Sequence, residues 1–302
     1  MSTNQICVGF VFTNFNNSQL TLNALRSIRE NCNGAKTFSI IVDNNSVDDE
    51  RKFLKEKLSD CSDVEVIFSR LNLGYFNGLN VGIRELRRRL PGFDFLIIGN
   101  NDLIFAKDFF STLHADRIHL KSNLIVCPDL VTLDNTHQNP HVLSNISRFR
   151  EVIWDLYFSN YHAAQLISKI STSLKKWVER SDYKQHELNG FIYQGYGACY
   201  IVTQNFFDKF DDLWAPGFLM GEEFYLATQL ESIGHKMYYW PQLKVLHHDH
   251  ATVSKIPSKK LWEYSREYHR IYRYFINPYR LSMRTSETIQ SYQSKIQRST
   301  ST

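Results

Sequence analysis

The chain has 302 residues, of which 43% are hydrophobic and 14% aromatic; this suits one large α/β domain with an appendage and excludes extensive disorder. Its 35 basic and 31 acidic residues leave a formal charge of +4, too small an excess to indicate a nucleic-acid partner. No stretch reaches the roughly 20 apolar residues of a membrane span, no signal peptide precedes Ile6, and the five cysteines are odd in number and scattered. These features predict a cytoplasmic protein with reduced thiols.

Short apolar runs alternate with helical patterns through the first hundred residues. Buried strands are predicted at residues 6–12, 38–42, 64–68 and 93–98, and amphipathic helices separate them. Helices between consecutive strands are typical of βαβ units, in which the strands run parallel. The sequence therefore predicts an α/β fold with a mostly parallel, doubly wound sheet flanked by helices.

Polar clusters follow three of these strands, at residues 13–17, 43–46 and 99–102. The carboxyl ends of parallel strands share one rim, and α/β proteins bind ligands there. Asp43 could hydrogen-bond a ribose or a base at this rim, and Asp102 could hold a metal ion against a phosphate. A polar turn is the simpler explanation of residues 99–102. Neither the dinucleotide fingerprint nor the phosphate-binding G-x-x-x-x-G-K-[ST] loop is present.

In this order the motifs resemble those of family 2 glycosyltransferases with the GT-A fold, nearest to the rhamnosyltransferase-like branch of bacterial polysaccharide synthesis. Residues 15–17 resemble the Tyr-Asn motif of the first strand, with Phe in place of Tyr, and residues 43–46 resemble the Asp-Asn-x-Ser nucleotide motif. Residues 72–82 match the Asn-x-Gly…Asn-x-Gly loop, and residues 100–102 stand at the Asp-x-Asp motif but keep only its last acid. The resemblance covers about residues 5–255.

The resemblance implies a nucleotide-sugar donor, a UDP-sugar or dTDP-sugar, and a divalent cation, Mg²⁺ or Mn²⁺. It assigns the cation to Asp102 and to His247, which follows an apolar run at residues 243–246. His248 and His250 have less support, because alternating residues of an extended chain face opposite sides. The donor-binding residues that the match implies are Thr13, Phe15, Asn16, Asp43, Asn45, Asn72, Gly74, Asn80, Asn100, Asn101, Gly197 and Ala198.

Two adjacent acids, Glu222 and Glu223, open a predicted helix in the second half of the chain. The helix dipole alone explains acids at such a position. The family, however, has Glu-Asp there, with the second acid as catalytic base, so the resemblance implies Glu223 as the base. The longer Glu side chain leaves open a shared role for Glu222.

Two helical segments lie outside these motifs. Residues 149–178 are aromatic and are interpreted as an acceptor-facing insertion by analogy with the fold. Residues 258–275 combine aromatics and arginines at helical spacing, which indicates either a helix docked on the catalytic domain or a basic face on an anionic membrane. We therefore divide the chain into a catalytic domain, 1–255, with a nucleotide-binding half (1–105) and an acceptor half (106–255), and a C-terminal helical extension and tail, 256–302.

The resulting hypothesis is a metal-dependent, inverting glycosyltransferase of bacterial surface polysaccharide synthesis, for O-antigen or capsule. Its acceptor would be a saccharide carried by polyprenyl diphosphate and reached from the inner face of the membrane. One alternative is a sugar-phosphate nucleotidyltransferase, although that class should show a Gly-rich, Lys/Arg-bearing signature where this chain has residues 13–17. The other is a degenerate sugar-binding or scaffold protein, which the reduced Asp-x-Asp motif favours.

Overall fold

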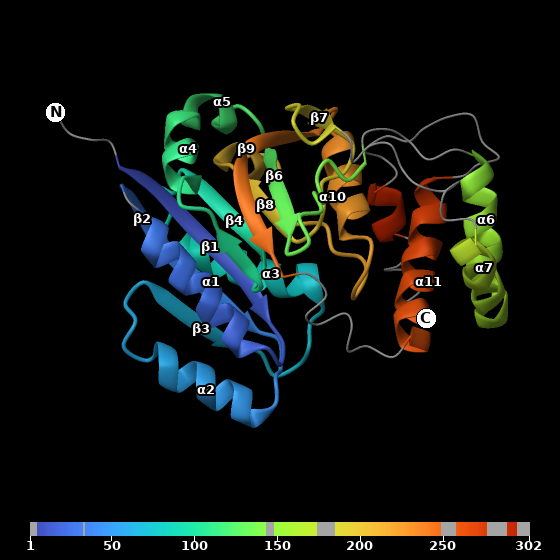
Figure 1. The fold of residues 1–302 in the computed structure, drawn as a ribbon, viewed down its shortest axis with the longest axis horizontal. Coiled ribbons are helices and arrows are strands. Elements are labelled where there is room, and N and C mark those ends of the chain that lie inside the picture. The colour runs from blue at the N-terminus through green and yellow to red at the C-terminus, as the bar shows by residue number, and fades with distance from the viewer. Residues whose placement is uncertain are drawn as a thin grey trace.

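A computed structural model describes residues 5–32, 34–142, 148–173, 185–248, 258–276 and 289–294. Figure 1 shows a twisted sheet with helices on both faces and a helical layer at one end. The strands are β1 (Ile6–Asn14), β2 (Ala35–Asp43), β3 (Val64–Phe68), β4 (Phe95–Asn100), β5 (Leu103–Phe105), β6 (Ile125–Thr132), β7 (Gly190–Ile192), β8 (Cys199–Val202) and β9 (Met237–His247). The helices are α1 (Ser18–Asn31), α2 (Asp48–Leu58), α3 (Tyr75–Arg89), α4 (Phe109–Ala115), α5 (Arg117–Lys121), α6 (Arg148–Ser159), α7 (Tyr161–Ser173), α9 (Gln204–Phe207), α10 (Glu222–Glu231) and α11 (Ser258–Phe275).

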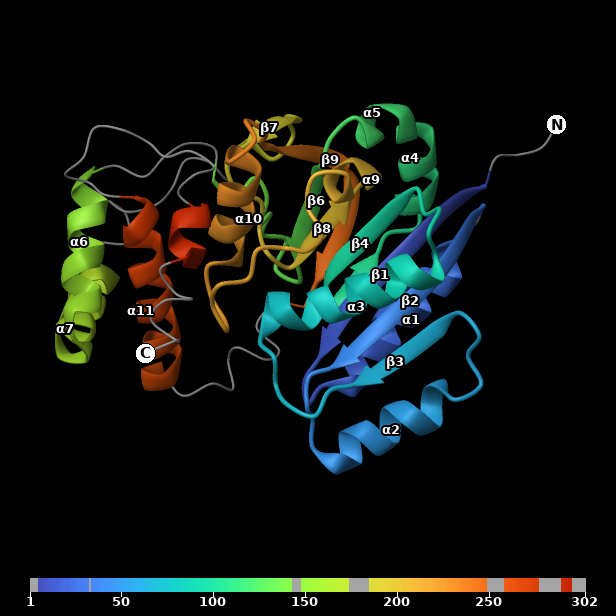
Figure 2. The same ribbon diagram turned by 180° about the vertical axis from the view of Figure 1, so that it is seen from behind.

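The four predicted strands form the parallel half of the sheet, in the order β3-β2-β1-β4. Both faces of this half are covered: α3 packs against β1 and β2 on the face seen in Figure 2, and α1 lies on the other. Side chains of β1 alternate between the two cores, with Phe10 and Phe12 in one and Val11 in the other. Burial on both faces explains why the inner strands β1 and β4 are continuous apolar runs.

The other half of the sheet is mixed. β8 pairs antiparallel with β4 and β6, β6 runs parallel to β9, and β5 and β7 pair antiparallel with β9. The apolar run at 243–246 belongs to the longer strand β9, which begins at Met237. Because Leu103 of β5 pairs with His247 at the end of β9, the short return after β4 brings residues 100–102 beside that histidine.

The C-terminal helix α11 is docked on the protein. Its apolar side contributes Ile271, Tyr272 and Phe275 to a core shared with Phe224 and Tyr225 of α10. Docking was one of the two interpretations of this segment, and it is confirmed. The basic aromatic membrane face is not supported, because the aromatic side points inward.

The basic side of α11 is also partly engaged within the protein. Arg273 forms ion pairs with Glu151 and with Asp155 of α6, and the Arg266 guanidinium lies over the Trp262 ring, 5.2 Å from its centroid. Among the described residues no helix has the length and apolar content to cross a membrane. His250, residues 174–178 and residues 277–288 lie outside the described ranges.

Candidate active site

A buried network of amides and hydroxyls joins the carboxyl ends of β1, β2 and β4. The register aligns Asn14 with Asp43 and Thr13 with Asn100. The Asn14 side chain donates to Asp43 Oδ1 at 2.9 Å, and the Asn101 side chain donates to Asn14 Oδ1 at 3.0 Å. Predicted site residues from three strands therefore meet at one rim. Asn14 itself was not predicted, although it lies within the flagged cluster at 13–17.

Asp43 is fully buried, and protein groups occupy both of its carboxylate oxygens. Asn14 donates to Oδ1, while the backbone N–H of Ser46 donates to Oδ2 at 3.2 Å and Arg51 Nε lies 3.7 Å from the same atom. In this geometry the Asp43 carboxylate holds the ends of β1 and β2 together from inside the protein. A nucleoside contact, as the resemblance implies, would have to use the remaining lone pairs of this buried carboxylate.

The loops after β1 and β2 are tied to each other. The backbone N–H of Asn16 donates to Ser46 Oγ at 2.9 Å, and Asn16 Oδ1 accepts from the backbone of Val47 at 2.9 Å. Asn16 and Asn45 have φ angles of 54° and 66°, a left-handed conformation that Asn adopts more readily than most residues. These asparagines shape the loops beside the partly exposed Thr13 and Phe15.

The loop at residues 72–75 is fixed against the same rim. The side chain of Asn44 donates to the Gly74 carbonyl at 2.8 Å, and the Gly74 N–H donates to Asn72 Oδ1 at 3.0 Å. Gly74 has φ +81°, and a Cβ there would lie 2.0 Å from the Phe218 carbonyl oxygen. Only glycine fits this position without strain.

Asn80, predicted to contact the donor, is buried on α3. Its side-chain amide donates to the Leu213 carbonyl at 2.8 Å, and its Oδ1 accepts from the Leu213 N–H at 2.9 Å. Both polar atoms of the side chain are thus used to hold α3 to the segment before α10. This geometry gives Asn80 a structural task and offers no support for a donor contact.

Asp102 and His247 face each other at the end of β9. Asp102 Oδ1 lies 3.3 Å from His247 Nε2, yet it is buried without a hydrogen-bond partner among the described residues. Leaving a buried carboxylate oxygen unpaired is costly unless a ligand completes it. The described residues contain no cluster of three or more His, Cys, Asp or Glu that could enclose a metal. A carboxylate and an imidazole therefore fit a cation that takes its other ligands from substrate phosphates and water.

The glycine-alanine segment before β8 lies against this strand end. Asn100 N–H donates to the Ala198 carbonyl at 2.9 Å, and a Cβ on Gly99 would come within 2.2 Å of that oxygen. The Gly197 N–H donates to Glu223 Oε1 at 3.0 Å, and Tyr75 Oη donates to the Gly197 carbonyl at 2.8 Å. The segment of Gly197 and Ala198 thus connects the end of β4 to Glu223 at the start of α10.

The two glutamates of α10 lie in different surroundings. Glu222 is buried, whereas Glu223 is partly exposed and bonded to Gly197. Burial, together with the nearby Glu223 charge, raises the pKa of Glu222 to about 8. At neutral pH the raised pKa favours the protonated form of Glu222.

Tyr75 indicates that the acids belong to one site. Burial raises the pKa of its phenol well above the ordinary value, and Glu222, the Cys199 thiol, Asp102 and Glu223 add to the increase. The hydrogen bonds give the same picture, because Tyr75 Oη donates to the Gly197 carbonyl and the N–H of that residue donates to Glu223. Tyr75 therefore lies beside Gly197 and Glu223, between the predicted donor site and the predicted base. The motifs of the sequence include it only within the loop at residues 72–82 and predict no role for it.

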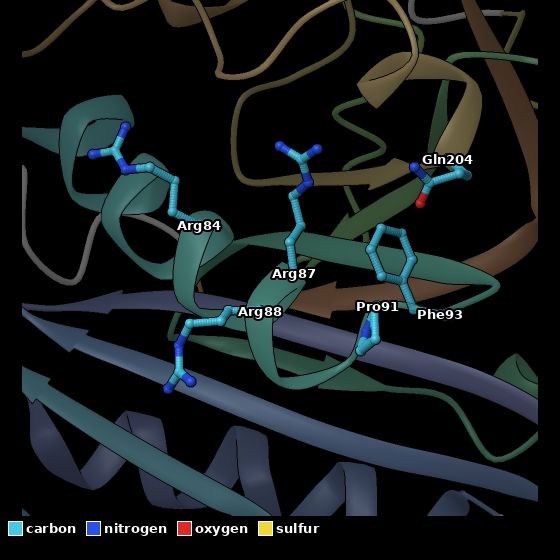
Figure 3. A pocket seen from close by; sticks show the side chains of 6 residues that line it. All are labelled: Arg84, Arg87, Arg88, Pro91, Phe93 and Gln204. Carbon is cyan, nitrogen blue, oxygen red and sulfur yellow. The ribbon is translucent and has the colours of Figure 1, made fainter.

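A basic pocket lies at the opposite end of β4. Figure 3 shows the arginines of α3 pointing in different directions around it. Arg84 pairs with Asp212 at 2.5 Å, and the Arg87 guanidinium lies 4.4 Å from the centroid of Phe207. Since α/β ligand sites lie at the carboxyl ends of strands, we do not assign this pocket to the active site. Its lining residues are Arg84, Arg87, Arg88, Pro91, Phe93 and Gln204.

A family model described as glycosyl transferase family 2 matches residues 10–166. Among solved structures, GalNAc-T7 with UDP, GalNAc and Mn²⁺ aligns with a TM-score of 0.53 and 13% identity, over 81% of this chain and 44% of that one. The mannosyltransferase PcManGT from Pyrobaculum calidifontis, in complex with GDP-Man and Mn²⁺, aligns with a TM-score of 0.50 and 12% identity, over 88% of this chain and 62% of that one. At these identities the likeness shows the fold, which is GT-A. No curated protein matches the sequence.

Proposed function

The chain belongs to glycosyl transferase family 2, and we propose that it transfers a sugar from a nucleotide-diphosphate donor to a saccharide acceptor with inversion at the anomeric carbon. The observation that carries this proposal is that a candidate cation site and a candidate base lie at the same rim. Asp102 Oδ1 lies 3.3 Å from His247 Nε2 and has no hydrogen-bond partner in the part of the chain that the structure describes, and Glu223 is bonded to Gly197 beside the same rim.

The donor would lie across the rim formed by β1, β2 and β4. We propose that the loops containing Thr13, Phe15, Asn16 and Asn45 border the nucleoside, as the motif resemblance implies. The diphosphate would lie toward Asn100, at the end of β4. A divalent cation, Mg²⁺ or Mn²⁺, held by Asp102 and His247 would supply positive charge to the departing diphosphate. Both named structural relatives contain Mn²⁺ and a nucleotide or nucleotide sugar; for this chain we propose a UDP-sugar or dTDP-sugar.

Glu223 would act as the general base. Its carboxylate would take the proton from the acceptor hydroxyl as the new bond forms between that oxygen and the anomeric carbon. The bond from the anomeric carbon to the diphosphate breaks on the opposite face, and the nucleoside diphosphate leaves with the electron pair. One displacement inverts the configuration. Burial raises the pKa of Glu222, whereas Glu223 is partly exposed and is bonded to Gly197 at the rim; this geometry favours Glu223 as the base.

The acceptor and the pathway rest on the motif resemblance alone. We propose a polyprenyl-diphosphate-linked glycan of bacterial surface polysaccharide synthesis, used from the cytoplasmic side. The packing of α11 removes the aromatic membrane contact that would have given this acceptor local support in the chain.

A panel of nucleotide sugars with Mn²⁺ tests the proposal. We expect one donor to raise the melting temperature and to release its nucleoside diphosphate by hydrolysis or by transfer to added saccharides. Glu223→Gln should keep the thermal stabilisation and lose the release. Release of pyrophosphate from a nucleoside triphosphate and a sugar phosphate would instead identify a nucleotidyltransferase. Binding without turnover in the unaltered chain would favour a sugar-binding or scaffold role.

A further inference from the structure

Gln138 lies directly behind His247, on the side of the ring away from Asp102. It belongs to the irregular segment after β6 and is buried, and its backbone N–H donates to the Leu130 carbonyl at 2.8 Å. Its side-chain Oε1 lies 2.7 Å from His247 Nδ1. This is the shortest of the three polar contacts described for that imidazole, since Asn100 and Asp102 each lie 3.3 Å from Nε2.

The chemistry of an amide oxygen fixes the proton of the imidazole. In this orientation of the amide, Gln138 Oε1 can only accept, so the short contact places the proton on Nδ1 of His247. Nε2 then carries the lone pair, and the Asn100 amide nitrogen, a donor, lies 3.3 Å from it. With the opposite tautomer, an N–H would occupy the direction that a cation ligand needs.

The surroundings hold Gln138 in place. The side chain of the next residue, Asn139, donates to the Pro128 carbonyl at 2.7 Å and accepts from the Tyr196 N–H at 2.8 Å. The Tyr196 ring in turn packs against His247, with 5.9 Å between the ring centroids. The segment is therefore fastened to β6 on one side and to the residue before Gly197 on the other.

We propose that Gln138 is a positioning residue for the divalent cation: it holds the Nδ1–H tautomer of His247 and so directs Nε2, together with Asp102, to one ion. This inference rests on the proposed function. Groups that hydrogen-bond a metal-binding histidine fix its tautomer and ring orientation, and their loss typically weakens metal affinity by about 10–100-fold.

The test compares Gln138→Leu, which removes the acceptor, with Gln138→Glu, which keeps an acceptor oxygen. Mn²⁺ is titrated into the full chain in the presence of UDP, and binding is followed calorimetrically below the melting temperature. We expect affinity to fall about 10–100-fold in the leucine variant and to be retained to within a few-fold in the glutamate variant. Gln194→Leu is the matched control, since Gln194 is partly buried near the same segment and has no described contact with His247.

Nitrogen NMR of ¹⁵N-histidine-labelled protein gives a second readout. The His247 signal, assigned by its loss in His247→Asn, should show the proton on Nδ1 in the unaltered chain. A proton on Nε2 there would overturn the inference even if Gln138→Leu fails to fold. So would unchanged Mn²⁺ affinity in a folded Gln138→Leu protein while Asp102→Asn and His247→Asn lose it, a result that leaves the proposed function standing. If the unaltered chain binds no Mn²⁺, with or without UDP, the metal part of the proposed function fails as well.

Discussion

Replacing Glu222 by Gln should make the protein more stable at neutral pH than the unaltered chain. Burial raises the pKa of this carboxyl from 4.5 to about 8. A carboxyl with a raised pKa keeps its proton in the folded state while the unfolded chain releases it. Its contribution to stability is therefore complete at acidic pH and is lost as the pH rises from about 4.5 to about 8. Gln keeps the shape of a protonated Glu and has no proton to lose.

The size of the effect follows from about 1.36 kcal/mol for each pH unit across this window. Between pH 5.5 and pH 7.5 the unaltered chain should lose roughly 2 to 3 kcal/mol relative to Glu222→Gln. For a chain of this length, the melting temperature of Glu222→Gln should exceed that of the unaltered chain by about 5 °C more at pH 7.5 than at pH 5.5. Thermal melts at the two pH values measure it, and Glu56→Gln controls for removal of a charge at an exposed side chain.

A constant difference between the melting temperatures of Glu222→Gln and the unaltered chain would refute this reasoning. Glu222 would then be ionised in the folded protein at neutral pH. The preference for Glu223 over Glu222 as the base would then rest on the bond from Gly197 to Glu223 alone.

Three further predictions concern the rim. Glu223→Gln should lower turnover about 10²-fold or more, because it removes the proton acceptor, with donor affinity from calorimetry within a few-fold of the original; normal transfer by this variant would exclude Glu223 as the base. Asp102→Asn should weaken Mn²⁺ binding, and excess chelator should stop transfer; full activity in chelator would leave Asp102 a hydrogen-bond acceptor only. Gly74→Ala should destabilise the protein in urea unfolding by at least about 1 kcal/mol more than Gly34→Ala. Both glycines have positive φ, but only a Cβ on Gly74 meets the Phe218 carbonyl. Equal effects of the two substitutions would show that the loop at residues 72–75 shifts to accept the extra carbon at no cost.

The parallel half of the sheet could be predicted because its signals are local. A strand buried on both faces is a continuous apolar run, and the polar cluster that follows marks where it ends. Parallel pairing then places the ends of neighbouring strands side by side, so Asn14, Asp43 and Asn101 meet without further information. What local patterns did not give is the direction of each side chain. Asp43 lies at the predicted strand end, but its carboxylate faces Asn14 and Ser46 inside the protein.

The mixed half could not be predicted in the same way. Its pairings join segments far apart in the chain, such as β5 with β9, and no periodicity in either segment encodes the partner. Gln138 illustrates the consequence. It lies in an irregular polar stretch with no motif, and it reaches His247 only because β6 runs beside β9.

The choice between Glu222 and Glu223 shows why a motif alone cannot assign a role. Successive residues of a helix point about 100° apart, so only one of two adjacent acids can face a given neighbour. Here the neighbour is Gly197, whose N–H reaches Glu223 Oε1, and a Cβ at Gly197 would lie 2.8 Å from that same atom. The other acid turns into the protein, where burial favours its neutral form. The ring of Tyr268 on α11 packs so closely on Gly221 that a Cβ there would meet it at 2.0 Å. The C-terminal helix thus fixes the start of α10, and with it which glutamate faces the rim, although no motif in that helix points to the active site.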